Sequence, residues 1–122
     1  TGNVTFHGWL DPDDMPERYR NADALVLPSY AEGSPNVILE AMASGLPVLA
    51  SDAPGCREIV GHEQHGLLLP VADPTAWRAA IDRLASEPDT RNRMGCAGLA
   101  RARWFAWPAI AQRHVDILRR LV

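Results

Sequence analysis

Two glutamates, Glu32 and Glu40, have seven residues between them in a segment, residues 28–43, that is otherwise mainly apolar. A carboxylate among apolar neighbours needs a partner that compensates its charge. Asn36 precedes Glu40 by four residues, so on a helix the two polar side chains share one face. The pattern indicates a polar site around Glu40. One alternative stays open, in which Glu40 occupies the single solvent-exposed stripe of an ordinary helix.

A strand, a loop and a helix are expected to position these glutamates. Residues 24–27 are a short apolar run typical of a strand covered on both faces. After the loop, Ser34 is placed to cap a helix and Pro35 suits its first position. In an open parallel sheet such a loop lies at the carboxyl end of its strand, where ligands bind. The free N–H groups at the helix start favour anions such as phosphates.

Strands and helices alternate along the whole chain. Strands are expected at residues 4–6, 24–27, 48–50 and 67–69, and helices at 11–21, 35–44, 56–60, 74–86, 88–104 and from 107 onward. This alternation predicts the α/β class, as a partial Rossmann-like doubly wound parallel sheet of about four strands with helices on both faces. Because a complete domain of this kind has about six strands, we expect one domain, residues 1–122, that is incomplete at its N-terminal side. The final helices, about 89–122, are expected to pack outside the sheet.

Two further groups of polar residues lie near the expected strand ends. Residues 51–55 form a second polar loop after a strand and are a candidate second wall of the same crevice. No role is assigned to Ser51 and Asp52 of this loop or to Glu58, which follows it. His62 and His65 have a spacing that could hold a metal ion, but no third ligand is nearby in the sequence, so we interpret them as loop histidines. No metal and no other cofactor is expected.

Composition excludes several classes of protein. The chain has 122 residues, 47% hydrophobic and 22% charged, which fits one globular domain. No apolar run approaches the roughly 20 residues of a membrane span, and no signal segment is expected from the residues at the start. Cys56 and Cys96 are far apart, which argues against a disulfide framework and favours packing roles in a reducing cytoplasm. The absence of an initiating Met suggests a piece of a longer protein.

Charge is distributed unevenly. Residues 1–75 hold eleven acidic side chains and three Arg, whereas residues 76–122 hold nine Arg and four acidic side chains. The arginines are spaced through helices rather than clustered, which is typical of solvated helix faces. No nucleic-acid partner is expected. Peripheral contact of these arginines with an anionic membrane surface stays open as an alternative.

From Phe6 onward the sequence resembles the carboxyl-terminal domain of the retaining glycosyltransferase family 4, which has the GT-B architecture of two facing Rossmann-like domains. The matching pieces are residues 19–24 before Pro28-Ser29, the two glutamates Glu32 and Glu40, residues 43–48 and residues 66–68. The spacing of the glutamates alone is weak, but its place among these flanking pieces is specific.

The resemblance implies a nucleotide-diphosphate sugar as donor substrate and a role for each matching position. Glu32, the predicted catalytic residue, would contact hydroxyls of the transferred sugar, and Glu40 would bind the ribose hydroxyls. The loop between them would bring its backbone close to the sugar at Gly33, Ser34 and Pro35. The N–H groups of Asn36 and Val37 would face the diphosphate. These implied roles agree with the close approach that glycine allows and with anion binding at a helix start.

Retention in this family is attributed to front-face attack by the acceptor, so catalysis depends mainly on positioning and on stabilising the leaving diphosphate. Glu32 is therefore interpreted as a residue that positions the sugar. Double displacement through a carboxylate stays open as an alternative. The resemblance implies an enzyme of hexosyltransferase type acting in glycan, lipopolysaccharide or exopolysaccharide synthesis, in the cytoplasm or at the inner face of the membrane.

The sequence departs from the family pattern in one respect. The family clamps the diphosphate with a glycine-containing turn and a basic pair upstream in the same domain, and nothing before Glu32 provides them. Arg18 and Arg20 lie on a predicted helix, and Arg57 is the only other Arg before position 76. The acceptor-binding N-terminal domain of the family is expected to lie outside these residues too. We therefore expect this chain alone to bind the donor weakly and to transfer nothing to the glycan, lipid or small-molecule acceptor.

Self-association is a further expectation, because Trp104, Phe105, Trp107 and the apolar stripe of the last helix lack the N-terminal domain as a partner. Two other functions stay open. One is a nucleotide-sugar epimerase of GT-B architecture. The other is a non-catalytic Rossmann-like or flavodoxin-like nucleotide-binding module, in which Glu32 and Glu40 serve only the structure.

Overall fold

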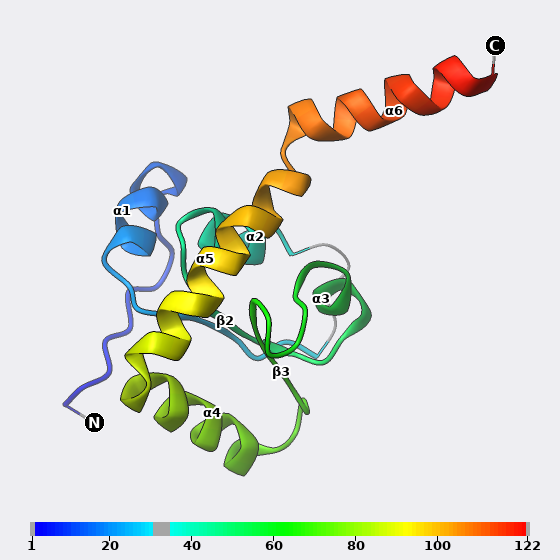
Figure 1. Ribbon diagram of the computed structural model, residues 1–122. Helices are drawn as coiled ribbons and strands as arrows, with labels where there is room; N and C mark the ends of the chain where they lie inside the picture. The colour runs from blue at the N-terminus through cyan, green and yellow to red at the C-terminus, as the bar shows by residue number, and fades with distance from the viewer. Residues whose placement is uncertain (1, 31–34, 122) are drawn as a thin grey trace.

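A parallel sheet flanked by helices forms the body of the protein in the computed structural model, which describes residues 2–30 and 35–121 (Figure 1). The described strands are β1 (Leu25–Leu27), β2 (Val48–Ser51) and β3 (Gly66–Leu69), in the order β1-β2-β3. Leu49 of β2 pairs with Val26 of β1 and with Leu67 of β3. The predicted α/β class with a parallel, doubly wound sheet is confirmed.

The helices follow the predicted order closely. They are the 3₁₀ turn η1 (Pro12–Asp14), α1 (Met15–Arg20), α2 (Asn36–Ala43), α3 (Pro54–Ile59), α4 (Pro74–Ser86), α5 (Pro88–Trp104) and α6 (Trp107–Leu121). Asp11 caps η1 and Asp73 caps α4, each by accepting a hydrogen bond from a nearby backbone N–H. Proline near the first position of several of these helices supplies a backbone already set for helix.

Strand β2 divides the hydrophobic core into two layers, and all its residues are buried. Val48 and Ala50 face the layer that contains α2 and α3, whereas Leu49 faces the layer built on α4. Successive side chains of a strand point to opposite faces of the sheet, so a central strand under two helical layers is apolar on both sides. This arrangement confirms that helices cover both faces.

Two strand predictions were wrong. About four strands were expected, but the described residues contain three, because residues 4–6 form no strand and Phe6 is 94% exposed. In the described residues this segment has no neighbouring strand, and an extended segment without ladder hydrogen bonds is not stable as a strand. The other error concerns β1, which was expected to be covered on both faces. Val26 is 42% exposed, because β1 is an edge strand and α4 packs against β2 and β3.

Helix α5 crosses α2 closely and fixes its C-terminal end (Figure 1). A Cβ atom at Gly95 of α5 would lie 2.1 Å from the carbonyl oxygen of Gly45, which is far inside van der Waals contact. Gly45 itself has φ of 78°, a left-handed conformation that ends α2 and that glycine adopts without strain. Glycine at both positions therefore allows the helix carrying Glu40 to dock against the rest of the body.

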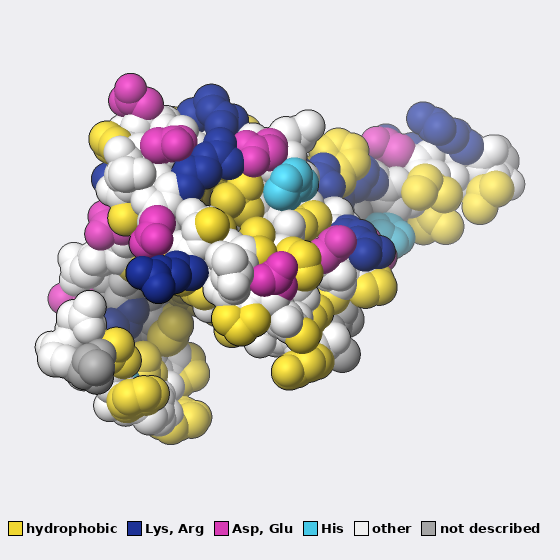
Figure 2. Space-filling view, turned by 90° about the horizontal axis from the view of Figure 1, so that it is seen from below, with side chains coloured by type: hydrophobic (Ala, Val, Ile, Leu, Met, Phe, Trp, Pro, Cys, Tyr) yellow, Lys and Arg dark blue, Asp and Glu magenta, His cyan; other side chains and the backbone are white. Residues whose placement is uncertain are grey.

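Helix α6 projects away from this body, and none of its described residues is buried (Figure 1). Its apolar side chains gather along one side of the projecting helix, with basic side chains on another (Figure 2). Among the apolar residues, Trp107 is 81% and Leu121 77% exposed. The Arg113 guanidinium of α6 lies 4.0 Å from the ring centre of Trp104 at the end of α5. The two cysteines differ: Cys56 is buried as predicted for a packing residue, whereas Cys96 on α5 is exposed and the prediction was wrong there.

Candidate functional site

Helix α2 starts at the carboxyl end of the sheet, after the loop that follows β1. Pro35 was expected at the first helical position, but it is the N-cap, with an extended backbone (φ −75°, ψ 101°), and the helix begins at Asn36. The Ile38 N–H donates to the Pro35 carbonyl at 3.1 Å. The N–H groups of Asn36 and Val37 belong to the first turn and have no acceptor within the helix.

Three predicted site residues, Glu32, Gly33 and Ser34, lie outside the described residues, and so does the predicted Ser34 cap. The structure places the other four along α2 or at its start: Pro35 is buried, Val37 half-buried, and Asn36 and Glu40 exposed. Asn36 and Glu40 thus share the exposed side of α2, while Ile38, Ala41 and Met42 are buried. Glu40 therefore lies on a solvent-exposed stripe of α2, because only one side of the helix packs into the core.

The Glu40 carboxylate has a specific partner that the sequence reasoning missed. The Tyr19 hydroxyl of α1 donates to Glu40 Oε2 at 2.7 Å. Tyr19 is 6% exposed and its ring belongs to the core that includes Ile38 and Met42 of α2. Burial, together with the hydrogen bond to Glu40, raises the pKa of Tyr19 far above its usual value. The hydroxyl therefore stays protonated and remains a donor to the carboxylate.

A hollow of about 670 Å³ lies beside this hydrogen bond. One wall comes from the N-terminal segment and α1, and the other from the exposed side of α2. Its lining residues are Leu10, Pro12, Met15, Pro16, Tyr19, Val37, Glu40, Ala43 and Ser44. The hollow is mostly apolar with one carboxylate, a combination typical of sites for small organic ligands. Glu40 Oε1, the oxygen that Tyr19 does not bind, is available to a donor from such a ligand.

The loop after β2 forms the neighbouring structure at the sheet edge. The Asp52 N–H donates to the Leu69 carbonyl at 2.8 Å, which ties the ends of β2 and β3 together. Arg57 of α3 makes an ion pair with the Asp52 carboxylate, and its hydrogen bond holds the pKa of Asp52 below the usual range. Both side chains are exposed. Arg57 is therefore already paired and is not a free cation for a phosphate.

Ser51 and Glu58 differ from this exposed pair. The Ser51 side chain is fully buried at the end of β2, and its Oγ has no hydrogen-bond partner among the described residues. Glu58 is exposed, and its backbone carbonyl accepts a hydrogen bond from Arg101 at 2.9 Å. That bond anchors α3 to α5.

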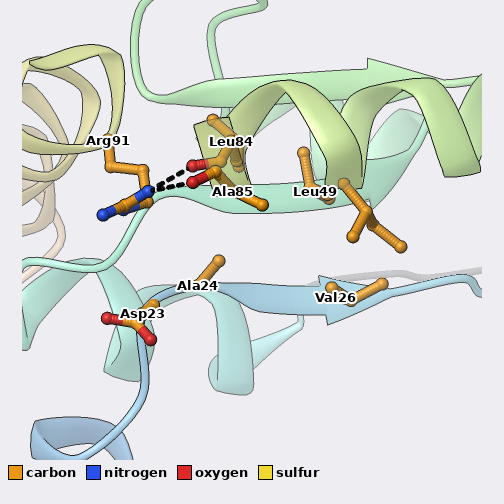
Figure 3. Close-up of a pocket in the computed structure, with 8 residues that line it drawn as sticks. Asp23, Ala24, Val26, Leu49, Leu84, Ala85 and Arg91 are labelled. Carbon is orange, nitrogen blue, oxygen red and sulfur yellow. Dashed lines mark hydrogen bonds between the residues drawn. The ribbon is translucent and has the colours of Figure 1, made fainter. Parts of the chain in front are cut away.

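A second hollow, of about 340 Å³, lies on the opposite side of the sheet, between β1 and the C-terminal part of α4 (Figure 3). Val26, Leu49 and Leu84 give it apolar walls, and Asp23 lies near its rim. The Arg91 guanidinium binds the carbonyls of Leu84 and Ala85 at the end of α4, so it caps that helix. This hollow follows from the uncovered face of β1 and lies away from Glu40.

Neither histidine of the residues 62–66 loop is free for a metal ion. His62 Nδ1 accepts from the Leu68 N–H at 3.0 Å, and His65 Nδ1 accepts from the Gly61 N–H at 2.9 Å. Burial lowers the pKa of His65, which keeps its ring neutral. Across residues 2–30 and 35–121, no three His, Cys, Asp or Glu side chains lie close enough together to hold a metal. In the same part of the chain no helix has the length and apolar character that a membrane span needs.

Comparison with known proteins shows the family. A family model described as glycosyl transferases group 1 matches residues 1–101. The chain therefore belongs to the glycosyltransferase group 1 family, and its sheet is similar to the C-terminal domain of GT-B glycosyltransferases.

Particular relatives agree with this assignment. A D-inositol 3-phosphate glycosyltransferase of Streptomyces griseus is 34% identical over 114 residues, which are 93% of this chain and 24% of that protein. Sucrose-phosphate synthase of Thermosynechococcus elongatus has 37% identity and a TM-score of 0.87 over 98% of this chain and 30% of its own. HepE of Anabaena, solved with UDP and glucose, has 26% identity and a TM-score of 0.84 over 96% of this chain and 32% of its own. The chain spans about a quarter of the length of the curated relatives that it matches.

Proposed function

We propose that the chain is the donor-binding part of a retaining glycosyltransferase of family 4 and that it binds a nucleotide-diphosphate sugar. The observation that carries the proposal is Glu40, an exposed carboxylate held by Tyr19 at the edge of a hollow along the exposed side of α2. HepE, a structural neighbour, was solved in complex with UDP-glucose, which supports a nucleotide sugar as the ligand class.

Each part of the donor has a matching group. Glu40 accepts hydrogen bonds from the ribose hydroxyls, for which a carboxylate is a strong acceptor. The N–H groups of Asn36 and Val37, at the positive end of α2, face the diphosphate. Glu32 contacts the hydroxyls of the transferred hexose, and the backbone at Gly33, Ser34 and Pro35 lies close to that sugar.

The reaction follows from positioning rather than from a protein nucleophile. The acceptor hydroxyl attacks the anomeric carbon from the side of the leaving diphosphate, the bond to the diphosphate oxygen breaks, and that leaving group takes the acceptor proton. The helix start stabilises the negative charge that develops on the diphosphate. Glu32 orients the sugar for this attack. We propose no metal and no other cofactor for this step.

The longer protein completes the site. Arg57 is paired with Asp52, and Arg18 and Arg20 lie in the last turn of α1, so a basic clamp for the diphosphate comes from another part of the protein. The edge of β1 and the apolar side of α6 are surfaces for that part to cover.

Alone, the chain binds donor weakly, is inactive, and self-associates through α6. The acceptor is a glycan, a lipid or a small molecule, in glycan, lipopolysaccharide or exopolysaccharide synthesis in the cytoplasm or at the inner membrane face.

Replacement of Glu40 in the full-length protein tests the proposal. Glu40→Ala removes the ribose acceptor, so affinity for UDP, measured by titration calorimetry, is expected to fall by about tenfold or more. Glu17→Ala removes an exposed glutamate of α1 and serves as the matched control with unchanged affinity.

Unchanged affinity of Glu40→Ala with a folded protein would remove Glu40 from the site and favour the non-catalytic module. Product analysis separates the enzyme classes. A glycosyltransferase joins the sugar to an acceptor, whereas an epimerase returns a nucleotide sugar with altered stereochemistry.

A further inference from the structure

We propose that Tyr19 is a positioning residue for donor binding: its hydroxyl fixes the Glu40 carboxylate in the orientation that receives the ribose hydroxyls. This inference rests on the proposed function, because it assumes that Glu40 meets the ribose. Tyr19 does not touch the donor in this assignment. It acts through Glu40 alone.

The geometry separates the two oxygens of the Glu40 carboxylate. Tyr19 Oη donates to Oε2 at 2.7 Å, a length expected for a hydroxyl bound to a carboxylate. Oε1 takes no part in this bond, and Glu40 lines the hollow of about 670 Å³. One oxygen is thus held by the protein while the carboxylate still has acceptor capacity for a ligand.

The two ends of this hydrogen bond differ in mobility. Tyr19 is 6% exposed, and its ring packs with Met15 and with the buried side of α2. Glu40 lies on the exposed side of α2, where a glutamate otherwise samples several rotamers. A rigid donor that holds a flexible acceptor removes rotamer freedom before the ligand arrives, and such preorganisation increases affinity.

The neutral donor also preserves the charge that ribose recognition uses. A tyrosine hydroxyl binds the carboxylate without cancelling its charge, whereas an arginine or lysine would neutralise it. The buried Tyr19 keeps its proton because its pKa is raised, so its role as donor persists at neutral and mildly alkaline pH. The hydroxyl therefore orients the carboxylate without compensating its charge.

Two ligands and three variants of the full-length protein test the role of Tyr19. The ligands are UDP and 2′,3′-dideoxy-UDP, which lacks the ribose hydroxyls. Tyr19→Phe keeps the buried ring and removes only the hydroxyl, and Glu40→Gln removes the charge of the acceptor. Thr90→Val is the matched control, because Thr90 Oγ1 donates to Glu87 Oε2 at the same 2.7 Å but on α5, away from the hollow.

Tyr19→Phe is expected to weaken UDP binding by about fivefold to tenfold, as loss of a hydrogen bond to a charged group predicts. The affinity of the same variant for 2′,3′-dideoxy-UDP is expected to lie within about twofold of the wild-type affinity, because this ligand has no ribose hydroxyl that could donate to Glu40. Thr90→Val is expected to bind both ligands as the wild type does, with a similar change in melting temperature to that of Tyr19→Phe.

Three results would overturn the inference, and they are distinguishable. If Glu40→Gln loses affinity for UDP while Tyr19→Phe does not, Tyr19 plays no part and the proposed function survives. If Tyr19→Phe weakens both ligands equally, the hydrogen bond serves only the fold. If Glu40→Gln binds UDP as tightly as the wild type, or the wild type binds neither UDP nor GDP nor ADP, the proposed function fails and the role of Tyr19 fails with it.

Discussion

Glu40 lies on α2 and Asp52 directly follows β2, and the two carboxylates meet partners of different charge. The Glu40 carboxylate accepts from the neutral hydroxyl of Tyr19, whereas the Asp52 carboxylate pairs with the guanidinium of Arg57. Tyr19 is buried under α2, and Arg57 is exposed to solvent at 57% of its side chain. One carboxylate is thus held by a buried neutral donor and the other by an exposed cation.

The difference indicates which carboxylate is suited to a ligand. An ion pair with Arg57 compensates the charge of Asp52 through its Oδ1, so Asp52 links β2 to α3 at the surface. The hydroxyl of Tyr19 leaves the negative charge of Glu40 in place beside a hollow. The partner of a carboxylate, more than the carboxylate itself, therefore separates the candidate site from an ordinary surface contact.

The largest expected effect concerns ligand affinity in the full-length protein. Glu40→Gln is expected to weaken UDP binding by about tenfold or more, since an amide is a poorer acceptor and offers no charge. Asp52→Asn, the matched amide change, is expected to alter affinity by less than about twofold. Titration calorimetry measures both. Equal losses in the two variants would abolish the distinction between them.

A smaller effect is expected on the stability of this chain itself. Tyr19→Phe removes a hydroxyl bonded to a charged acceptor and should lower the free energy of unfolding by about 1 kcal/mol. Arg57→Gln should lower it by less, because the ion pair with Asp52 is exposed and screened by water. Urea unfolding followed by circular dichroism compares the two. A greater loss in Arg57→Gln would mean that the surface pair, not Tyr19, holds the site together.

The pH dependence of the free energy of unfolding is expected to reflect the raised pKa of the buried Tyr19. The folded-state pKa of Tyr19 is raised above its ordinary value of 10.0, so its contribution is fully present below pH 10.0 and is lost as the pH rises further. The stability advantage of wild type over Tyr19→Phe should therefore shrink above that pH. Urea unfolding midpoints of both proteins between neutral and alkaline pH measure this difference. A difference that stays constant would contradict a raised pKa of Tyr19.

The smallest expected effect concerns the pKa of a single side chain, that of Asp52. Its pKa is held below the ordinary value of 3.8 by Arg57, so any stability from this pair is present above that value and is lost as the pH falls through the folded-state pKa. Arg57→Gln should return the pKa of Asp52 towards 3.8. Carboxyl NMR titration follows it, with Glu63, which is held by Arg83 instead, as the unchanged reference.

The order of helices and three of the strands could be predicted from local patterns. Apolar runs such as residues 48–50 identify buried strands, and pairs such as Asp73-Pro74 mark helix starts. Residues 4–6 have the same local character as a strand but form none, because a strand exists only where another strand supplies its hydrogen bonds. Val26 of β1 is exposed for a similar reason, because α4 packs against β2 and β3 and leaves that face of β1 uncovered.

For the candidate site, the sequence indicated Glu40 but not its partner. Tyr19 precedes Glu40 by 21 positions and lies on a different helix, so no spacing rule joins them. Its one signal in the sequence was its place in the run at residues 19–24 that resembles the family. The stretch that contains Glu32, Gly33 and Ser34 lies outside the described residues, so their roles remain predictions from the sequence.

The sequence by itself determined the α/β class, the helix that carries Glu40 and the membership in a family of glycosyltransferases, because periodicity and motifs are local properties of the chain. Only the tertiary structure decided that Tyr19 binds Glu40, that Arg57 is occupied by Asp52 and that α6 leaves its apolar side uncovered. These three features depend on which elements pack together. Contacts between residues distant in the sequence follow from the packing of the whole core, which no local pattern specifies.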